Sequence, residues 1–583
     1  MKKSGKIIVS ALAMAITVSA FAGCGTKDLS SNNPSKVYYA NSTGEFLTYG
    51  YHPPTDGSYR IDSDRYQTVD ENGNPVDFRT EERYKEYLDA GLNLLFIQGN
   101  DGYSGYDFEN SQLKKNMDNA YAAGLKKVSV HDTRLYWPST VGDSAGKSRV
   151  TFGYLNGRDK NFVIPDGKLA TDVITDPDFI KDDYDAVYKS AYGDKDYAEL
   201  SDEEKSALKE SVSAAFEILV KYAETCLAEY KDHPAFYGVM LVDEPTWYQL
   251  PQTCLMVKAV RKASNNLGIS DMFIQVNLLP MDTQNASGNY SPNKDKTDEA
   301  QYEEYVETYA VRSGEKRIGM DVYPMRETKN DGNSDYTIFS KYYVNLKVLE
   351  RVAKKYVCSL AGVAQSCELT KDKEGNTISF KAPNESDMYW QLNSYMGFGF
   401  TEFSYYVYWS KQDNAAGGYH TDGTMFITHD GEKTPLYYQM QKIHAEMQRF
   451  APVMLNFDYQ GFNYYTNGRT IFQTTYLSAC EADKKSFDKL ESVSVGESQI
   501  AVVTELLDEA NGQYMYMLMN PNAPCNEKKG DASLKATLKF STEYTAAEVW
   551  YKGEMLLYPL DKNGEITFDL SAGYAVYVMP YKA

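Results

Sequence analysis

The sequence is poor in residues that bind metals or form disulfides. Its 583 residues include only six histidines and seven cysteines. No two cysteines have C-x-x-C spacing and no two histidines have H-E-x-x-H spacing, which excludes a cysteine scaffold and argues against a catalytic zinc site. No glycine-rich loop that could cradle a phosphate precedes a helical segment. We therefore expect neither a metal nor another cofactor.

Long apolar runs are equally scarce. The run Ile7–Phe21 follows Lys2, Lys3 and Lys6 and is shorter than the roughly 20 residues that span a bilayer, so residues 1–23 are predicted to be a secretory signal. It ends in Phe21-Ala22-Gly23-Cys24, which resembles the lipobox of bacterial lipoproteins. The resemblance implies acylation of Cys24 and a lipid anchor on the outer face of the bacterial cell membrane. Cleavage by ordinary signal peptidase is the alternative, because Phe21 is uncommon at its position.

Basic residues are outnumbered by acidic ones. The formal net charge is −21, and losing the three signal lysines makes it −24. Such a surface repels phosphate backbones and anionic lipid, so we expect no nucleic-acid partner and no membrane contact beyond the anchor. Neutral carbohydrate is not repelled. The sequence carries no signal for an oligomeric state.

Aromatic residues make up 14% of the chain and include 50 tyrosines. A tyrosine ring can stack on a sugar while its hydroxyl binds the sugar's edge, although most of these tyrosines are expected to fill the core or the surface.

Residues 46–452 alternate short apolar runs with amphipathic helical patterns, after a polar tether over residues 24–45. The eight runs are Phe46–Tyr51, Leu92–Gln98, Lys127–His131, Phe236–Asp243, Met272–Asn277, Ile318–Tyr323, Tyr356–Gln365 and Phe398–Tyr406. Eight strand–helix pairs predict an α/β fold of the (β/α)8 TIM-barrel type. A doubly wound sheet is the competing architecture.

Two insertions and a second domain complete the expected organisation. Pro138–Leu200 would form a long third loop over the barrel mouth, and Leu369–Lys381 a small hairpin. Residues 455–583 alternate as strands and are predicted to form an all-β sandwich. Within it, Asn563-Gly564 indicates a hairpin between Leu557–Leu560 and Glu565–Leu570.

Active residues of such barrels lie at the carboxyl ends of the strands. Here those ends carry many polar groups, whereas the strands themselves are apolar: His52, Asn100, His131-Asp132, Asp243-Glu244, Asn277, Asp321, Gln365 to Glu368, and Glu402 to Trp409. A barrel with a purely structural role would not need carboxylates there.

The segment from His233 to Pro245 resembles the fourth strand of clan A glycoside hydrolases, in which a glutamate beside a proline is the general acid/base. Ala90-Gly91-Leu92-Asn93, Asp321-Val322-Tyr323-Pro324 and Tyr406-Val407-Tyr408-Trp409 resemble other parts of that barrel, with β-galactosidase-like members nearest. The resemblance covers the whole barrel as short matches. It implies an O-glycosyl hydrolase with Glu244 as acid/base.

Physical chemistry also favours Glu244. Cleaving a glycosidic bond requires a carboxylic acid with a raised pKa, and the charge of Asp243 would raise the pKa of its neighbour. The alternative is that both residues merely cap the following helix or pair with a surface lysine.

The second carboxylate is less clearly marked. Clan A enzymes place a nucleophile at the end of strand seven, where Glu368 is the nearest candidate, followed by Glu402 and Asp321. Asp243-Glu244 also matches the acidic pair of hexosaminidase-like barrels, in which the substrate's acetamido group is the nucleophile. Both mechanisms remain open.

The remaining strand-end residues are expected to hold the sugar: Asp243, Asp132, Asn277, Asp321, Tyr323, Gln365, Glu402, Tyr406 and Trp409. The predicted function is an exported glycoside hydrolase acting on oligo- or polysaccharides. The alternatives are a non-catalytic glycan-binding lipoprotein and a structural envelope protein.

Overall fold

A computed structural model describes most of the folded part of the chain. The described residues are 44–55, 60–62, 65–66, 68–99, 108–132, 135, 140–142, 148–150, 176–180, 195–281, 295–330, 333–370, 378–410, 425–468, 475–484, 486–522 and 533–582. The predicted signal, Cys24 and most of the tether and of the Pro138–Leu200 insertion lie outside these residues.

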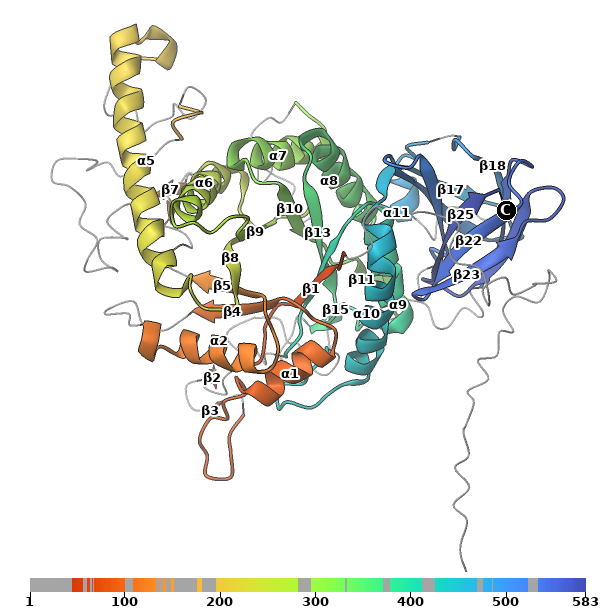
Figure 1. Ribbon diagram of the computed structural model, residues 1–583, viewed down its shortest axis with the longest axis horizontal. Helices are drawn as coiled ribbons and strands as arrows, with labels where there is room; N and C mark the ends of the chain where they lie inside the picture. The colour runs from red at the N-terminus through yellow and green to blue at the C-terminus, as the bar shows by residue number, and fades with distance from the viewer. Residues whose placement is uncertain are drawn as a thin grey trace, which may run out of the picture.

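Eight parallel strands form the central sheet, which confirms the predicted (β/α)8 barrel (Figure 1). They are β1 (Leu47–Gly50), β4 (Leu95–Gly99), β5 (Val128–Asp132), β8 (Phe236–Asp243), β9 (Phe273–Leu278), β10 (Arg317–Asp321), β13 (Ser359–Gln365) and β16 (Glu402–Tyr406). The helices around them are α1 (Glu81–Asp89), α2 (Gln112–Ala122), α5 (Asp202–Tyr230), α6 (Leu250–Asn266), α7 (Asp298–Ser313), α8 (Tyr342–Tyr356), α9 (Glu385–Gly397) and α10 (Pro435–Met454). Their apolar faces and the outer face of the strands form one continuous core.

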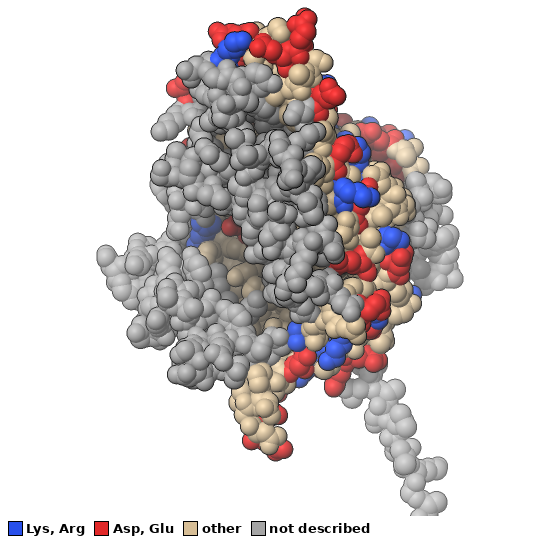
Figure 2. Space-filling view, turned by 90° about the vertical axis from the view of Figure 1, so that its left-hand side faces the viewer, with Lys and Arg blue, Asp and Glu red and all other residues tan. Residues whose placement is uncertain are grey.

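Local sequence explains where the helices begin. Ser201 and Glu204 form the predicted capping box at the start of α5. Pro435 occupies the first turn of α10, where a missing backbone N–H costs nothing. Acidic residues follow the Ser201 cap and suit the positive end of the α5 dipole, and Figure 2 shows a dense group of Asp and Glu where this helix begins.

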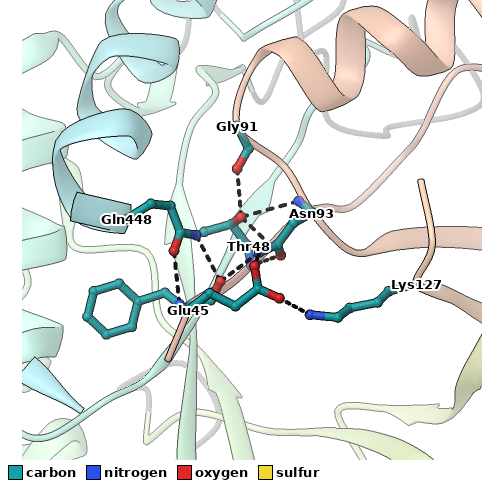
Figure 3. Close-up of polar contacts among 7 residues, drawn as sticks. Glu45, Thr48, Gly91, Asn93, Lys127 and Gln448 are labelled. Carbon is teal, nitrogen blue, oxygen red and sulfur yellow. Dashed lines mark hydrogen bonds and ion pairs between the residues drawn. The ribbon is translucent and has the colours of Figure 1, made fainter. Parts of the chain in front are cut away.

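The barrel closes between β1 and β4 through two backbone hydrogen bonds, from the N–H groups of Asn93 and Leu94 to the Thr48 carbonyl, and through side chains (Figure 3). The Asn93 side chain accepts a hydrogen bond from the Thr48 N–H at 2.9 Å and donates one to the Phe46 carbonyl at 2.8 Å. The Thr48 hydroxyl donates to the Gly91 carbonyl at 2.7 Å. Higher up, the buried Tyr87 hydroxyl accepts from the Gly50 N–H and donates to the Leu94 carbonyl. These side chains supplement the two backbone bonds and satisfy backbone groups that a longer ladder would otherwise pair.

Asn93→Ala is therefore expected to lower the free energy of unfolding by about 1–3 kcal/mol, because the Thr48 N–H loses its side-chain acceptor and the Phe46 carbonyl keeps only the hydrogen bond from Gln448. Chemical denaturation followed by circular dichroism would measure the change. The matched control is Asn266→Ala, which removes an exposed amide bonded only to Glu224 and should shift stability by less than about 0.5 kcal/mol. Equal effects of the two substitutions would contradict a closing role for Asn93.

Two hairpins stand beside the barrel in one four-stranded sheet. The predicted hairpin over Leu369–Lys381 is present as β14 (Leu369–Thr370) and β15 (Ile378–Phe380). It pairs with β11 (Met325–Asn330), which forms a second hairpin with β12 (Asn333–Ile338) that we did not predict. An Asp331-Gly332 dipeptide between β11 and β12 is the sequence signal for it.

The C-terminal part is an antiparallel two-sheet domain, as predicted. One sheet contains β17 (Asp458–Thr466), β19 (Ile500–Asp508), β20 (Gln513–Met519), β25 (Ala575–Tyr581), β22 (Ala546–Tyr551) and β23 (Glu554–Pro559). The other contains β18 (Leu490–Val495), β21 (Leu534–Phe540) and β24 (Glu565–Leu570). Alternate residues such as Val503, Leu518 and Leu538 fill the space between the sheets.

The predicted hairpin at Asn563-Gly564 is wrong. Strand β23 pairs with β22, and β24 pairs with β21 in the other sheet. Gly564, at φ 78°, instead completes a tight turn, with its N–H donating to the Asp561 carbonyl, that carries the chain from one sheet to the other.

The β domain packs against the side of the barrel formed by α9 and α10 (Figure 1). The Asn393 side chain of α9 accepts from the Tyr577 hydroxyl of β25 and donates to the Gly573 carbonyl. In the described part of the chain, no helix is long and apolar enough to cross a membrane.

Candidate active site

Asp243 and Glu244 lie at the carboxyl end of β8, where both keep solvent-exposed surface. Glu244 has a positive φ of 48°, a conformation that non-glycine residues rarely adopt and that is found mainly where the surrounding structure imposes it. Its N–H donates to the Asn277 carbonyl at 2.8 Å, and the Asn277 side-chain amide donates to Asp243 Oδ1 at 2.9 Å. Strand β9 therefore fixes both acidic residues of β8.

Asp321, at the end of β10, completes a group of three carboxyls with Asp243 and Glu244, which we call the acidic cluster. Its side chain is buried and hydrogen-bonds with Glu244 and with the Tyr323 hydroxyl. Burial, followed by the negative charges of Glu244 and Asp243, raises the pKa of Asp321 well above its usual range. The burial of Asp321 and the carboxyls beside it therefore disfavour its ionisation.

The same surroundings affect Asp243. Desolvation by the protein atoms around its carboxyl raises the pKa of Asp243, and the hydrogen bond from Asn277 opposes that rise only in part. His131, at the end of β5, is neutral at physiological pH, because burial lowers its pKa to about 4. The cluster therefore gains no positive charge from this histidine.

Tyrosines form the wall beside the acidic cluster. The rings of Tyr323 and Tyr406 lie 5.4 Å apart between centroids, and both remain partly exposed. His52 lies 5.6 Å from Tyr406, edge to face. Burial, together with the negative charges of the cluster, raises the pKa of both tyrosines. Such a wall suits the face of a sugar ring.

The floor under the cluster is polar and was not predicted. The Gln275 side-chain amide of β9 donates to the Tyr51 hydroxyl at 2.9 Å, and the charges of Asp243 and Asp321 act on Tyr51. Gln275 lies two residues before Asn277, on the same face of its strand, and this period-two spacing was the available signal.

The structure corrects the prediction that Glu402 binds sugar. Glu402 begins β16, so it lies at the opposite end of the barrel from the mouth. It is buried and ion-paired with Arg317 at 2.6 Å, and Arg317 also donates to the Tyr49 hydroxyl at 2.9 Å. Glu402 therefore stabilises the bottom of the barrel.

Two further sugar ligands are also corrected. Trp409 is completely buried, with its ring 4.8 Å from Phe78, so it offers no surface for stacking. Gln365 is buried at the end of β13, where its side chain accepts from the Met325 N–H and donates to the Lys381 carbonyl. Its amide fixes the two hairpins to the barrel.

The other predicted residues lie at the mouth end of the barrel, but not all of them belong to the acidic cluster. Asp132 is buried at the end of β5 and accepts a hydrogen bond from the Tyr230 hydroxyl at 3.2 Å. Glu368 lies between β13 and β14 and acts on the neighbouring Cys367. It is not among the largest electrostatic influences on Asp321. Asn100 lies outside the described residues.

Asp321→Asn is expected to make the folded protein more stable at neutral pH. The pKa of Asp321 is higher in the folded than in the unfolded protein, so the unfolded state ionises first as the pH rises. The parent therefore loses stability as the pH rises above the ordinary aspartate pKa of about 3.9. The difference in stability between Asp321→Asn and the parent should grow as the pH rises above about 3.9 and should level off above the raised pKa of Asp321. Thermal melts from pH 4 to 8 measure it, and an advantage that is largest at acid pH would contradict the assignment.

Comparisons with known proteins give the following. No family model matches the chain, and no curated protein matches it in sequence. Among solved structures, it is similar to a glycoside hydrolase family 5 from Bacteroides vulgatus ATCC 8482, at 11% identity over 88% of this chain and 91% of that one, with a TM-score of 0.42. It is also similar to a catalytic mutant of a GH42 beta-galactosidase from G. stearothermophilus, at 9% identity over 94% and 99%, with a TM-score of 0.40. A beta-galactosidase from Bacillus circulans sp. alkalophilus is 9% identical over 92% and 99%, with a TM-score of 0.37.

Proposed function

We propose that this chain is a glycoside hydrolase whose general acid/base is Glu244, acting together with Asp321. The observation that carries the proposal is the hydrogen bond between these two carboxyls at the mouth of the barrel. Neighbouring carboxyls whose ionisation is disfavoured can hold the proton that a departing glycosidic oxygen needs. The tyrosine wall beside it supplies a surface for the sugar.

The pair itself does not provide both groups of a double-displacement mechanism. Retaining enzymes hold two carboxyls about 5–5.5 Å apart and inverting enzymes roughly 6.5–9.5 Å, so that the anomeric carbon or a water fits between them. Directly hydrogen-bonded carboxyls leave no such gap. Glu368 is therefore retained as the candidate nucleophile, and Asp243, Asn277, Asp321, Tyr323 and Tyr406 as the groups that hold the sugar.

The test is hydrolysis of a broad oligosaccharide panel by the protein lacking residues 1–24, with products identified by mass. Glu244→Gln, which keeps the side-chain shape and removes the transferable proton, is run in parallel. Sugar release by the parent and its loss in the variant support the proposal. A folded parent that releases no sugar from any member of the panel would contradict it.

Glycan binding without hydrolysis is the second candidate function. The direct contact between Glu244 and Asp321 favours it, because no second carboxyl in that contact lies at a catalytic spacing. A glycan array distinguishes the two functions: retention of an intact oligosaccharide that the parent never cleaves would favour a binding protein.

We also propose that the protein is exported and held on the outer face of the cell membrane through a lipid on Cys24. The basic segment, short apolar run and lipobox-like ending of residues 2–24 support this. The parent should then incorporate labelled palmitate, and Cys24→Ser should not. A parent that incorporates no label would exclude the lipid anchor.

A further inference from the structure

The four-stranded sheet of β12, β11, β15 and β14, which we call the auxiliary sheet, is held on the barrel by several contacts. Its two hairpins are inserted after β10 and β13, at the end of the barrel where binding loops lie. The Lys381 N–H donates to the Met325 carbonyl at 3.1 Å, and Lys381 Nζ pairs with the buried Asp387 carboxylate of α9 at 2.9 Å. The Phe339 N–H donates to the Pro324 carbonyl at 2.7 Å. The sheet therefore presents its side chains to the barrel in fixed positions.

One aromatic side chain of the auxiliary sheet reaches the tyrosine wall. The Phe380 ring of β15 lies 5.9 Å from the Tyr323 ring between centroids, at an interplanar angle of 87°. Such an edge-to-face contact is favourable and holds the two rings at a defined angle. Phe380, Tyr323 and Tyr406 also pack on one apolar cluster, which contains barrel-strand residues such as Val363. Phe380 therefore belongs to the surroundings of the tyrosine wall and not only to its own sheet.

A second side chain of the auxiliary sheet holds the backbone of Tyr323. Arg326 Nε donates to the Tyr323 carbonyl at 3.1 Å, and the Arg326 guanidinium lies over the Phe339 ring, 3.8 Å from its centroid. Stacking of this kind orients a planar guanidinium. Pro324 follows Tyr323 and favours an extended backbone there. Arg326 and Phe380, which are paired across β11 and β15, thus hold the backbone and the ring of the same tyrosine.

We infer that the auxiliary sheet sets the orientation of the Tyr323 ring for sugar binding, with Arg326 and Phe380 as positioning residues. The inference rests on the proposed function, which assigns Tyr323 to sugar binding, and extends that site to a part of the chain outside the barrel. A Tyr323 ring held in contact with both Phe380 and Tyr406 is preorganised, so a sugar that stacks on it loses little affinity to ordering the ring. The alternative is that the sheet only stabilises the fold.

The experiment measures binding of the β-linked trisaccharides of glucose, galactose, mannose and xylose by calorimetry, in a Glu244→Gln background that leaves bound sugar intact. Phe380→Leu and Arg326→Met each remove a contact with Tyr323 and keep most of the apolar volume. We expect each to weaken binding about 3–10-fold, and Phe380→Tyr, which keeps the ring, to change it less than about 2-fold. Both positions are partly exposed, so the variants should fold, which circular dichroism verifies.

A double-mutant cycle separates positioning from a general structural role. When Tyr323→Leu is added to the background, Phe380→Leu and Arg326→Met should each change binding less than about 2-fold, because the ring through which they act is gone. Equal losses with and without the Tyr323 ring would overturn the inference. Unchanged binding in both variants would overturn it too, as would failure of the Glu244→Gln protein to bind any of the four trisaccharides.

These outcomes are distinct from failure of the hydrolase proposal. If a trisaccharide binds but no sugar is cleaved by the parent, the hydrolase proposal fails and the cycle still decides the role of Arg326 and Phe380. If the parent cleaves a sugar and the substitutions act independently of Tyr323, the hydrolase proposal stands and the inference fails.

Discussion

Replacing Glu402 by glutamine should lower the free energy of unfolding by about 3–5 kcal/mol. Glu402 and Arg317 form a buried ion pair, and glutamine keeps the shape and an acceptor but removes the negative charge. The Arg317 guanidinium would then stay buried beside the Tyr49 hydroxyl, a neutral amide and the Phe273 ring, without the carboxylate that balances its charge. An uncompensated buried charge is costly, so the bottom of the barrel should open first.

Denaturant unfolding measures this loss, and two variants make the result specific. Asp89→Asn breaks an exposed ion pair with Lys85 and should cost less than about 1 kcal/mol. The double variant Arg317→Met with Glu402→Leu removes both charges and should recover most of the stability lost in Glu402→Gln. If Glu402→Gln costs no more than Asp89→Asn, the pair does not stabilise the barrel.

Glu244→Gln should reduce kcat/KM on an unactivated oligosaccharide by about 10²–10⁴-fold. Glutamine cannot transfer a proton, and the Asp321 carboxyl that remains is the buried member of the pair. The fold should be unaffected, because the Glu244 N–H, which pairs with the Asn277 carbonyl, is retained.

Glu368→Gln is the informative comparison, since it removes a carboxylate from the same end of the barrel. A loss as large as that of Glu244→Gln would identify Glu368 as the nucleophile. A loss below about 10-fold would leave the nucleophile to water or to the substrate. If Glu244→Gln retained parental activity, the acid/base assignment would be wrong.

The strands and helices of the barrel could be predicted because each strand is buried on both faces and reads as a short apolar run. Glu244 could be predicted because it directly follows the apolar run Phe236–Asp243, which marks the end of a strand. Glu402 was misplaced because the apolar run from Phe398 to Tyr406 does not reveal that the strand itself begins at Glu402. The mouth end of that strand is Tyr406.

Other errors come from contacts between residues far apart in the chain. Gln365 looks like a free amide at a strand end, but its partners are the backbones of Met325 and Lys381. The pairing of β24 with β21 overrides the local turn signal at Asn563-Gly564. The contact between Asp321 and Glu244 joins the ends of two strands with β9 between them, and the sequence carries no local sign of it.

The most direct test of the central claim, that Glu244 donates a proton to the leaving oxygen, is the dependence of its loss on the leaving group. The parent and Glu244→Gln would be assayed on two glycosides of the same sugar, one with an alkyl leaving group and one with 2,4-dinitrophenol, which departs without protonation. We predict that Glu244→Gln lowers kcat/KM about 10²–10⁴-fold on the alkyl glycoside and less than about 10-fold on the dinitrophenyl glycoside. Equal losses on both substrates would contradict the role of Glu244 as general acid.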